Sequence, residues 1–166
     1  MSRYDSLSGG EPLSASITGT GWSGVSILVP CMNEAATIEK CVSEIAAAVP
    51  GAEIVVVHGG SDDTLDRVAN LRPSIPRLQL VKNHDDRGKG HAVRVGINAA
   101  TEQVIAQFDA DMQFHPEDLP VILSPVLEGR ADICIGSRFL PSSQASADAA
   151  VLTRDSRDES AHGGRH

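Results

Sequence analysis

Short apolar runs alternate along the middle of the chain with longer segments in which apolar residues recur every third or fourth position. The short runs are rich in β-branched residues and predict strands at Val25–Val29, Glu53–Val57, Leu78–Lys82, Val104–Phe108 and Ile133–Ile135. The longer segments predict helices at Ala35–Val49, at Asp63–Leu71, from Lys89 or Gly90 to Ala100, and from near Pro116, where Pro120 and Pro125 should keep the helix short or kinked. Regular alternation of this kind indicates an α/β fold with a mostly parallel sheet and helices on both faces.

The two flanks of this region lack such patterns. Residues 1–24 are rich in Ser, Gly and Thr, and residues 141–166 contain mainly Ser, Ala, Asp and Arg without apolar periodicity. Segments of this composition cannot bury enough apolar surface to fold alone. We therefore expect one domain over residues 25–140 between a disordered N-terminal segment and a disordered polar tail.

Composition narrows the classes of function. With 166 residues, 41% of them hydrophobic, the chain is long enough for one core. A net charge of −8 argues against nonspecific binding of nucleic acid or of an anionic membrane surface. The three cysteines have neither disulfide-framework nor zinc-site spacing, and the sequence has no long apolar run and no signal-peptide pattern. These features predict a cytoplasmic protein that does not span a membrane.

Two carboxylates follow the fourth predicted strand. Asp109 and Asp111 are spaced one residue apart, so both side chains point to the same side of an extended chain. Ligands of open α/β sheets bind at the carboxyl ends of strands, and such oxygens suit Mg²⁺ or Mn²⁺ holding a diphosphate. Gln113 has the same parity and can add a neutral oxygen. The alternative is a solvated loop.

Polar loops follow the first two predicted strands as well. The loop from Pro30 to Glu34 contains no glycine, so it is not a GxGxxG dinucleotide turn. Asn33 can instead cap the next helix and Glu34 can favour its dipole. In His58–Thr64, glycines permit a tight turn, and Ser and Asp oxygens can cap the following helix or meet a ribose or base.

The third and fifth predicted strands are followed by cationic residues. The turn from Asp85 to Ala92 contains Arg87 and Lys89, and glycines flank the lysine at a helix start. Such a turn suits phosphate, although its cations can also pair with its own aspartates. Arg138 can clamp a phosphate or pair with a surface carboxylate.

Taken in order, these strand ends resemble the family 2 glycosyltransferases, whose pattern is VPxYNE, VDDGSxDxT, GKGxA, DxD and GSR. The resemblance extends over about Val25 to Leu140 and is nearest to dolichyl- or polyprenyl-phosphate hexose (mannose) synthases, because Asp109–Gln113 is similar to their DADxQ metal motif. It implies a GT-A fold, which is a Rossmann-like nucleotide-sugar-binding sheet. It also implies metal-dependent transfer of a hexose from a nucleotide diphosphate sugar to a polyprenyl phosphate, at the cytosolic face of the membrane.

The resemblance also implies roles for individual residues. The metal ligands would be Asp109, Asp111 and Gln113. The nucleotide-sugar contacts would be Pro30, Met32, Glu34, Val57, Lys89, Asp109, Ala110 and Asp111. The catalytic residues would be Asp111 and Arg138, with Arg138 near the transferred sugar or the acceptor phosphate. An acceptor phosphate is already ionised near neutral pH, so no strong general base is required.

Three departures from the family pattern stand out. His58 and Gly59 replace two acids, the second of which normally reads the base, and Met32 replaces an aromatic residue. The chain also turns polar at Pro141, where the family continues into its acceptor-binding half. We therefore expect an incomplete acceptor half, an exposed sheet edge, and association with a partner subunit or with a second copy of the chain.

Two other functions follow from the same residues. The first is a truncated, catalytically inactive relative that binds metal and nucleotide together with a partner chain. The second, a nucleotidyltransferase, is weaker, because those enzymes usually carry a Gly-rich loop where this chain has Pro30–Glu34.

Overall fold

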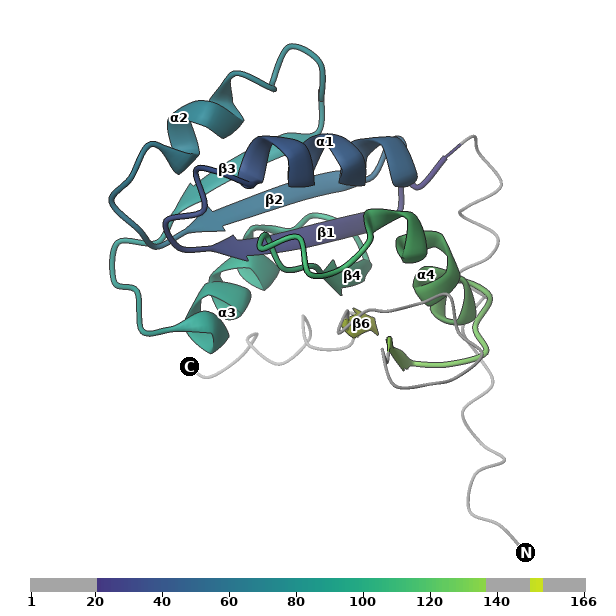
Figure 1. Ribbon diagram of the computed structural model, residues 1–166. Coiled ribbons are helices and arrows are strands. Elements are labelled where there is room, and N and C mark those ends of the chain that lie inside the picture. The colour runs from purple at the N-terminus through teal and green to yellow at the C-terminus, as the bar shows by residue number, and fades with distance from the viewer. Residues whose placement is uncertain (1–20, 137–149, 154–166) are drawn as a thin grey trace, which may run out of the picture.

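A six-stranded sheet organises the protein in the computed structural model, which describes residues 21–136 and 150–153 (Figure 1). The strands are β1 (Val25–Cys31), β2 (Glu53–His58), β3 (Leu78–Lys82), β4 (Val104–Gln107), β5 (Ile133–Ile135) and β6 (Ala150–Thr153). Their order is β3-β2-β1-β4-β6-β5, in which the first four are parallel and β6 runs antiparallel to both neighbours. The predicted α/β class and mostly parallel sheet are confirmed.

Helices cover both faces of the sheet (Figure 1). They are α1 (Ile38–Ala48), α2 (Thr64–Ala69), α3 (Lys89–Ala99), the short 3₁₀ helix η2 (Pro116–Asp118) and α4 (Leu119–Leu127). On β1, alternate residues face opposite ways, so Ile27 and Val29 join the core beneath α1, whereas Leu28 packs with Val55 and Ala92 beneath α3. No helix in the described ranges is long and apolar enough to cross a membrane.

The predicted element bounds agree with the structure except at a few ends. β3 and β5 have the predicted bounds, β1 continues two residues further to Cys31, and β4 ends one residue early at Gln107. The first helix begins at Ile38 instead of Ala35, because the preceding residues form a turn in which the Thr37 and Ile38 amides donate to the Glu34 carbonyl. The fourth helix is short and contains Pro125, as predicted.

One strand lies where no regular structure was expected. β6 falls within residues 141–166, which composition assigned to a disordered tail, and it pairs with β4 on one side and β5 on the other. The remaining residues of both predicted disordered segments lie outside the described ranges, apart from residues 21–24. β5 is an edge strand, and Ile133 and Ile135 are 56% and 69% exposed.

A buried carboxylate joins the amino ends of the central strands. Glu53 is 3% exposed and accepts hydrogen bonds from the Ser26 hydroxyl, from Gln79 Nε2 (2.6 Å) and from the amide and hydroxyl of Thr101 (both 2.8 Å). Burial acts to raise the pKa of Glu53, but the hydrogen bonds outweigh it and the pKa is lowered. Glu53 is therefore held as an anion at the amino ends of the strands, on the opposite side of the sheet from the polar loops at their carboxyl ends.

Candidate functional site

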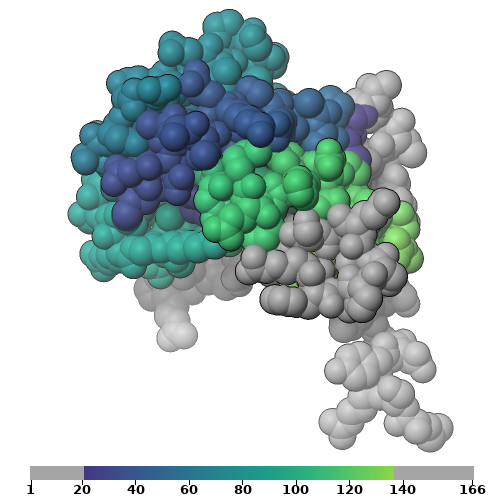
Figure 2. Space-filling view, viewed as in Figure 1, coloured from purple at the N-terminus to yellow at the C-terminus, as the bar shows by residue number. Residues whose placement is uncertain are grey.

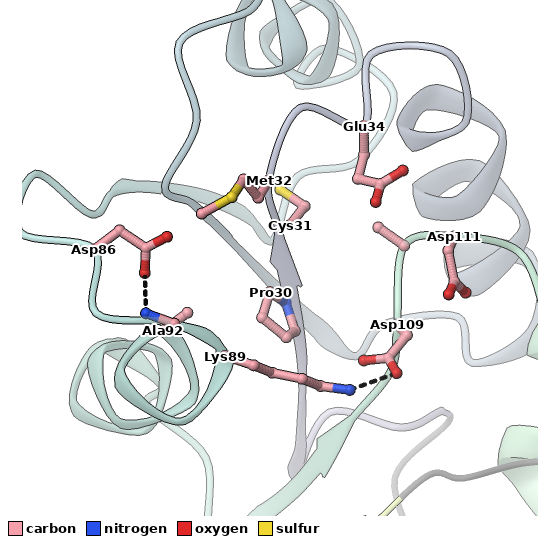
Figure 3. Close-up of a pocket in the computed structure, with 11 residues that line it drawn as sticks. Pro30, Cys31, Met32, Glu34, Asp86, Lys89, Ala92, Asp109 and Asp111 are labelled. Atoms are coloured by element: carbon pink, nitrogen blue, oxygen red, sulfur yellow. Dashed lines mark hydrogen bonds and ion pairs between the residues drawn. The ribbon is translucent and has the colours of Figure 1, made fainter.

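A pocket of about 350 Å³ lies at the carboxyl ends of β1 and β4, beside the start of α3 (Figure 3). The segments that contribute to it lie side by side on one face of the molecule, where purple, teal and green surfaces meet (Figure 2). Its lining residues are Pro30, Cys31, Met32, Glu34, Asp86, Gly88, Lys89, Ala92, Asp109, Ala110 and Asp111. The pocket is thus built where an open α/β sheet binds ligands.

Most of the residues singled out from the sequence line this one pocket. They are Pro30, Met32, Glu34, Lys89, Asp109, Ala110 and Asp111. Two do not line it: Val57 is 1% exposed and packs in the core beneath α3, and Gln113 is exposed outside the pocket. Arg138 lies outside the described residues.

Asn33 braces the loop after β1 against the loop after β2. It has a φ of 56°, a left-handed conformation that asparagine tolerates better than most residues. Its Oδ1 accepts hydrogen bonds from the amides of Ser61 (3.0 Å) and Asp62 (3.3 Å). The alternative in which Asn33 caps the first helix is therefore wrong, because the residue before that helix is Thr37.

Asp62 holds the second loop together. Its Oδ1 accepts from the amide (3.1 Å) and hydroxyl (2.6 Å) of Thr64, and its Oδ2 accepts from the Ala35 amide (3.2 Å). The hydrogen bonds from Thr64 are the main cause that lowers the pKa of Asp62. His58, only 2% exposed, places Nε2 3.1 Å from Asp62 Oδ1. The Asp62 carboxylate thus organises the turn and the start of α2.

The turn before α3 presents a lysine to the pocket. Gly88 has a φ of 91°, a conformation that strongly favours glycine, and Lys89 is the first residue of α3. The Lys89 Nζ lies 2.6 Å from Oδ2 of Asp109, not beside the aspartates of its own turn. Backbone N–H groups of the first helical turn have no partner within the helix and carry partial positive charge. An anion in this part of the pocket would therefore meet both an ammonium group and a helix start.

The two carboxylates after β4 are held by neighbouring groups. Asp109 Oδ1 accepts a hydrogen bond from Gln107 Nε2 (3.3 Å). Asp111 Oδ1 accepts one from the backbone N–H of Gln113 (3.1 Å), across a turn in which Met112 has a φ of 60°. Both residues line the pocket, as predicted, but they follow the end of β4 at Gln107, and Asp111 lies in a turn instead of an extended chain.

The donor atoms at this corner fit a hard divalent cation. Asp109 already faces a positive charge, the Lys89 ammonium group. Within the described residues, no group of three or more His, Cys, Asp or Glu side chains is arranged to hold a metal ion. Mg²⁺ does not require such a cage, because it is usually held by one or two carboxylates together with substrate phosphates and water.

Two buried cysteines at the pocket are poor nucleophiles: Cys31, which lines it, and Cys41 on α1, which does not. Burial, with a smaller effect of the Glu34 charge, raises the pKa of Cys31 to about 12, and burial also raises the pKa of Cys41 to about 12. The Cys31 thiol donates to the Val57 carbonyl at 3.6 Å. That Cys31 and Asp86 line the pocket was not predicted from the sequence. Cys31 ends β1 and Asp86 lies in the loop after β3, and these positions could have indicated it.

Comparison with known proteins matches residues 26–158 to the family described as Glycosyl transferase family 2. The chain is 34% identical over 119 residues to the dolichol-phosphate mannosyltransferase of Pyrococcus furiosus, covering 70% of this chain and 33% of that protein. It is 30% identical over 122 residues to the polyprenol monophosphomannose synthase of Mycolicibacterium smegmatis, covering 69% of this chain and 45% of that protein. The chain thus spans less than half the length of these relatives.

Solved structures have the same fold. A mannosyltransferase from Pyrobaculum calidifontis in complex with GDP-Man and Mn²⁺ superposes with a TM-score of 0.64 at 24% identity, covering 79% of this chain and 44% of that chain. Glucosyl-3-phosphoglycerate synthase from Mycobacterium tuberculosis, in complex with Mn²⁺, UDP and phosphoglyceric acid, gives a TM-score of 0.59 at 26% identity, covering 73% and 44%.

Proposed function

Because the chain belongs to glycosyl transferase family 2 and has its GT-A fold, we propose that the pocket binds a nucleoside diphosphate sugar whose hexose is transferred to a polyprenyl phosphate. The observation that carries this proposal is the meeting of Lys89, Asp109 and Asp111 in one pocket at the carboxyl ends of the strands. A cation and two carboxylates together suit a diphosphate that arrives with a divalent metal ion.

Lys89 is the residue that would bind the diphosphate directly. The Lys89 side chain is 59% exposed, and among the described residues it makes one ion pair, with Asp109. This contact can therefore be exchanged for a phosphate oxygen. The start of α3 adds the partial positive charge of its backbone N–H groups. Both would stabilise the negative charge that develops on the leaving nucleoside diphosphate.

Asp109 and Asp111 are the residues that would hold Mg²⁺ or Mn²⁺, with Gln113 as a third ligand. A bound cation would neutralise charge on the diphosphate. Of the two aspartates, Asp111 is the more exposed and would act at the reacting end. Arg138 is proposed to contact the transferred sugar or the acceptor phosphate.

The proposed acceptor is a polyprenyl phosphate at the cytosolic face of the membrane. Two of the relatives are named for dolichol-phosphate mannose transfer and polyprenol monophosphomannose synthesis, which supports this class. A phosphate oxygen attacks the anomeric carbon without first losing a proton near neutral pH, so the site needs no strong base. A partner subunit or a second copy of the chain would supply further acceptor contacts.

A panel of nucleotide sugars with Mn²⁺ tests the proposal. Each donor is mixed with the protein, with and without a short-chain polyprenyl phosphate, and both the thermal shift and the release of nucleoside diphosphate are measured. We expect a metal-dependent shift with at least one donor, and release that depends on the acceptor. A shift without release would favour the inactive metal- and nucleotide-binding relative, and neither a shift nor release with any donor would contradict both functions.

A further inference from the structure

We propose that Asp86 reads the base of the bound nucleotide and selects guanine or uracil, which carry a ring N–H, over adenine or cytosine. This assignment rests on the proposed nucleotide-binding function and makes it more specific. It follows from the charge pattern of the pocket, from the way the Asp86 carboxylate is held, and from the absence of a side chain at Gly59.

The two ends of the pocket differ in charge. Lys89 lies with Asp109 and Asp111 toward one end, and Asp86 lies apart from them across the pocket, beyond Met32 (Figure 3). A nucleotide whose phosphate lies beside Lys89 can extend along the pocket toward Asp86. A carboxylate repels phosphate, so the group that Asp86 meets must be a neutral hydrogen-bond donor.

Asp86 is fixed in place by one of its two oxygens. Oδ1 accepts from Asn83 Nδ2 (3.1 Å) and from the Gly88 amide (3.0 Å). Asn83 is itself tied to the end of β2, because its amide donates to the His58 carbonyl at 2.8 Å. No hydrogen bond joins Oδ2 of Asp86 to another residue of the described ranges, so this oxygen can accept from a ligand.

Gly59 leaves the space that this oxygen occupies. A Cβ atom on Gly59 would lie 2.5 Å from Asp86 Oδ2 and 2.7 Å from its Cγ, closer than real contacts allow. Position 59 is also where the family pattern has its second acid. Gly59 has no side chain, so the space beside the end of β2 is filled instead by the carboxylate of Asp86, from the loop after β3.

The carboxylate favours particular bases by simple complementarity. Guanine N1 and uracil N3 carry a ring hydrogen that can be donated to Oδ2. Adenine N1 and cytosine N3 are acceptors, so these two bases can reach Oδ2 only through an exocyclic amino N–H, which is the weaker complement to the carboxylate when the ring nitrogen faces it. Met32 is 53% exposed beside Asp86 and offers a flexible apolar surface on which a flat ring can lie (Figure 3).

The test is the affinity for four nucleoside diphosphates, measured by calorimetry with Mn²⁺. The wild type is expected to bind GDP or UDP at least tenfold more tightly than ADP and CDP. Asp86→Asn retains a carbonyl oxygen for the Asn83 and Gly88 contacts but presents an amide donor in place of Oδ2. It should lose roughly 10- to 100-fold in affinity for the preferred base and gain relative affinity for ADP or CDP. Asp85→Asn, the same charge change at the exposed neighbouring aspartate, should leave all four affinities unchanged.

A second variant guards against a purely structural effect. Gly59→Asp combined with Asp86→Gly moves the carboxylate to the end of β2, and it should restore the guanine or uracil preference that Asp86→Gly alone removes. Pyrophosphate with Mn²⁺, which has no base, should bind wild type and Asp86→Asn equally.

Three results would overturn the assignment. The first is an unchanged base preference in Asp86→Asn, and the second is an equal loss for all four nucleotides, which would mean that Asp86 contacts the ribose. The third is absence of binding of every nucleoside diphosphate to the wild type, which would overturn the proposed function as well. Only the third result contradicts the proposed nucleotide-binding function as well as the role of Asp86, so failure of the function can be told from failure of the Asp86 assignment alone.

Discussion

Lys89 and Asp109 form an ion pair of 2.6 Å across the pocket, although 20 residues separate them in the chain. The pair joins the start of α3 to the end of β4, with side-chain exposures of 59% for the lysine and 19% for the aspartate. A partly exposed pair of this kind contributes at most about 1 kcal/mol to folding. Its partners are therefore available to a ligand that offers each of them a stronger contact.

Lys89→Ala should weaken nucleoside diphosphate binding without unfolding the protein. The variant removes one charge-assisted hydrogen bond to phosphate, which corresponds to a loss of roughly tenfold or more in affinity. Calorimetry with GDP and UDP in the presence of Mn²⁺ measures this loss. Lys82→Ala removes an exposed lysine outside the pocket and is the matched control. Equal affinities for both variants would argue against a phosphate contact by Lys89.

Asp109→Asn and Asp111→Asn should each reduce the Mn²⁺ dependence of nucleotide binding. Each removes one of the two anionic oxygen donors at the proposed metal corner, and Mg²⁺ or Mn²⁺ prefers charged oxygen ligands. Titration of Mn²⁺ at fixed nucleotide, followed by the paramagnetic signal of free Mn²⁺, reports the change directly. Asp66→Asn alters an exposed carboxylate on α2 and should behave like wild type. Unaltered Mn²⁺ binding in both pocket variants would place the metal elsewhere.

Glu53→Gln should destabilise the fold by about 1–3 kcal/mol at pH 7, because a buried carboxylate with several donors is replaced by an amide that cannot accept from all of them. The pKa of Glu53 is lowered in the folded state, so its contribution is present above the unfolded value of about 4.3 and is lost as pH falls through the folded value. Urea unfolding at several pH values measures the difference, which should shrink below about pH 4.

The control for this variant is Glu117→Gln, which changes an exposed carboxylate on η2. Nucleotide affinity should be unaffected by Glu53→Gln, since the carboxylate lies at the opposite edge of the sheet from the pocket. If Glu53→Gln were as stable as wild type at pH 7, the hydrogen bonds of Glu53 would not stabilise the fold as expected.

Cys31 and Cys41 should resist alkylation in the folded protein. With a pKa of about 12, each thiol is ionised to only about one part in ten thousand at pH 8. Cys134 is only partly buried and should be labelled first. Peptide mass spectrometry after timed iodoacetamide treatment, with and without guanidinium, resolves the three sites. Labelling of Cys31 as fast as Cys134 in the absence of denaturant would be inconsistent with this environment.

Asn33→Ala should be less stable than Asn33→Gly by about 1 kcal/mol. Both variants lose the hydrogen bonds from Ser61 and Asp62, but only alanine is strained at a φ of 56°. Asn98→Ala, an exposed helical asparagine, should not destabilise the protein, because alanine is the better helix former. Urea midpoints of the three variants provide the comparison. The opposite order of the two Asn33 variants would mean that the left-handed conformation is not maintained in solution.

β1, β2 and β4 could be predicted because each is a short run rich in β-branched residues and almost wholly buried, the pattern expected at the centre of an α/β sheet. β3, at the edge of the sheet, is only partly buried. β6 could not be predicted, because a four-residue strand in a polar segment is specified by its pairing with β4 and β5 and not by its own sequence. A strand of four residues is too short to show a recognisable alternation of apolar and polar positions.

The pocket could be predicted in part for a similar reason. Asp109 and Lys89 lie in segments that follow parallel strands, so both must lie on the side of the sheet where the strands have their carboxyl ends. The position of Asp86 depends on how the loops after β2 and β3 pack together, which includes the missing side chain of Gly59. Val57 was expected at the pocket from resemblance alone, but its parity on β2 directs it to the core beneath α3.

The order of strands in the sheet has a consequence for synthesis on the ribosome. β5 precedes β6 in the chain, yet within residues 21–136 and 150–153 β5 pairs with no strand but β6, whose Leu152 backbone pairs with Ile105 on one side and Ile133 on the other. The parallel strands β1 to β4 can assemble as they emerge, whereas β5 must wait for residues that are translated later. The β5–β6 side of the sheet can therefore close only after the four parallel strands have been translated.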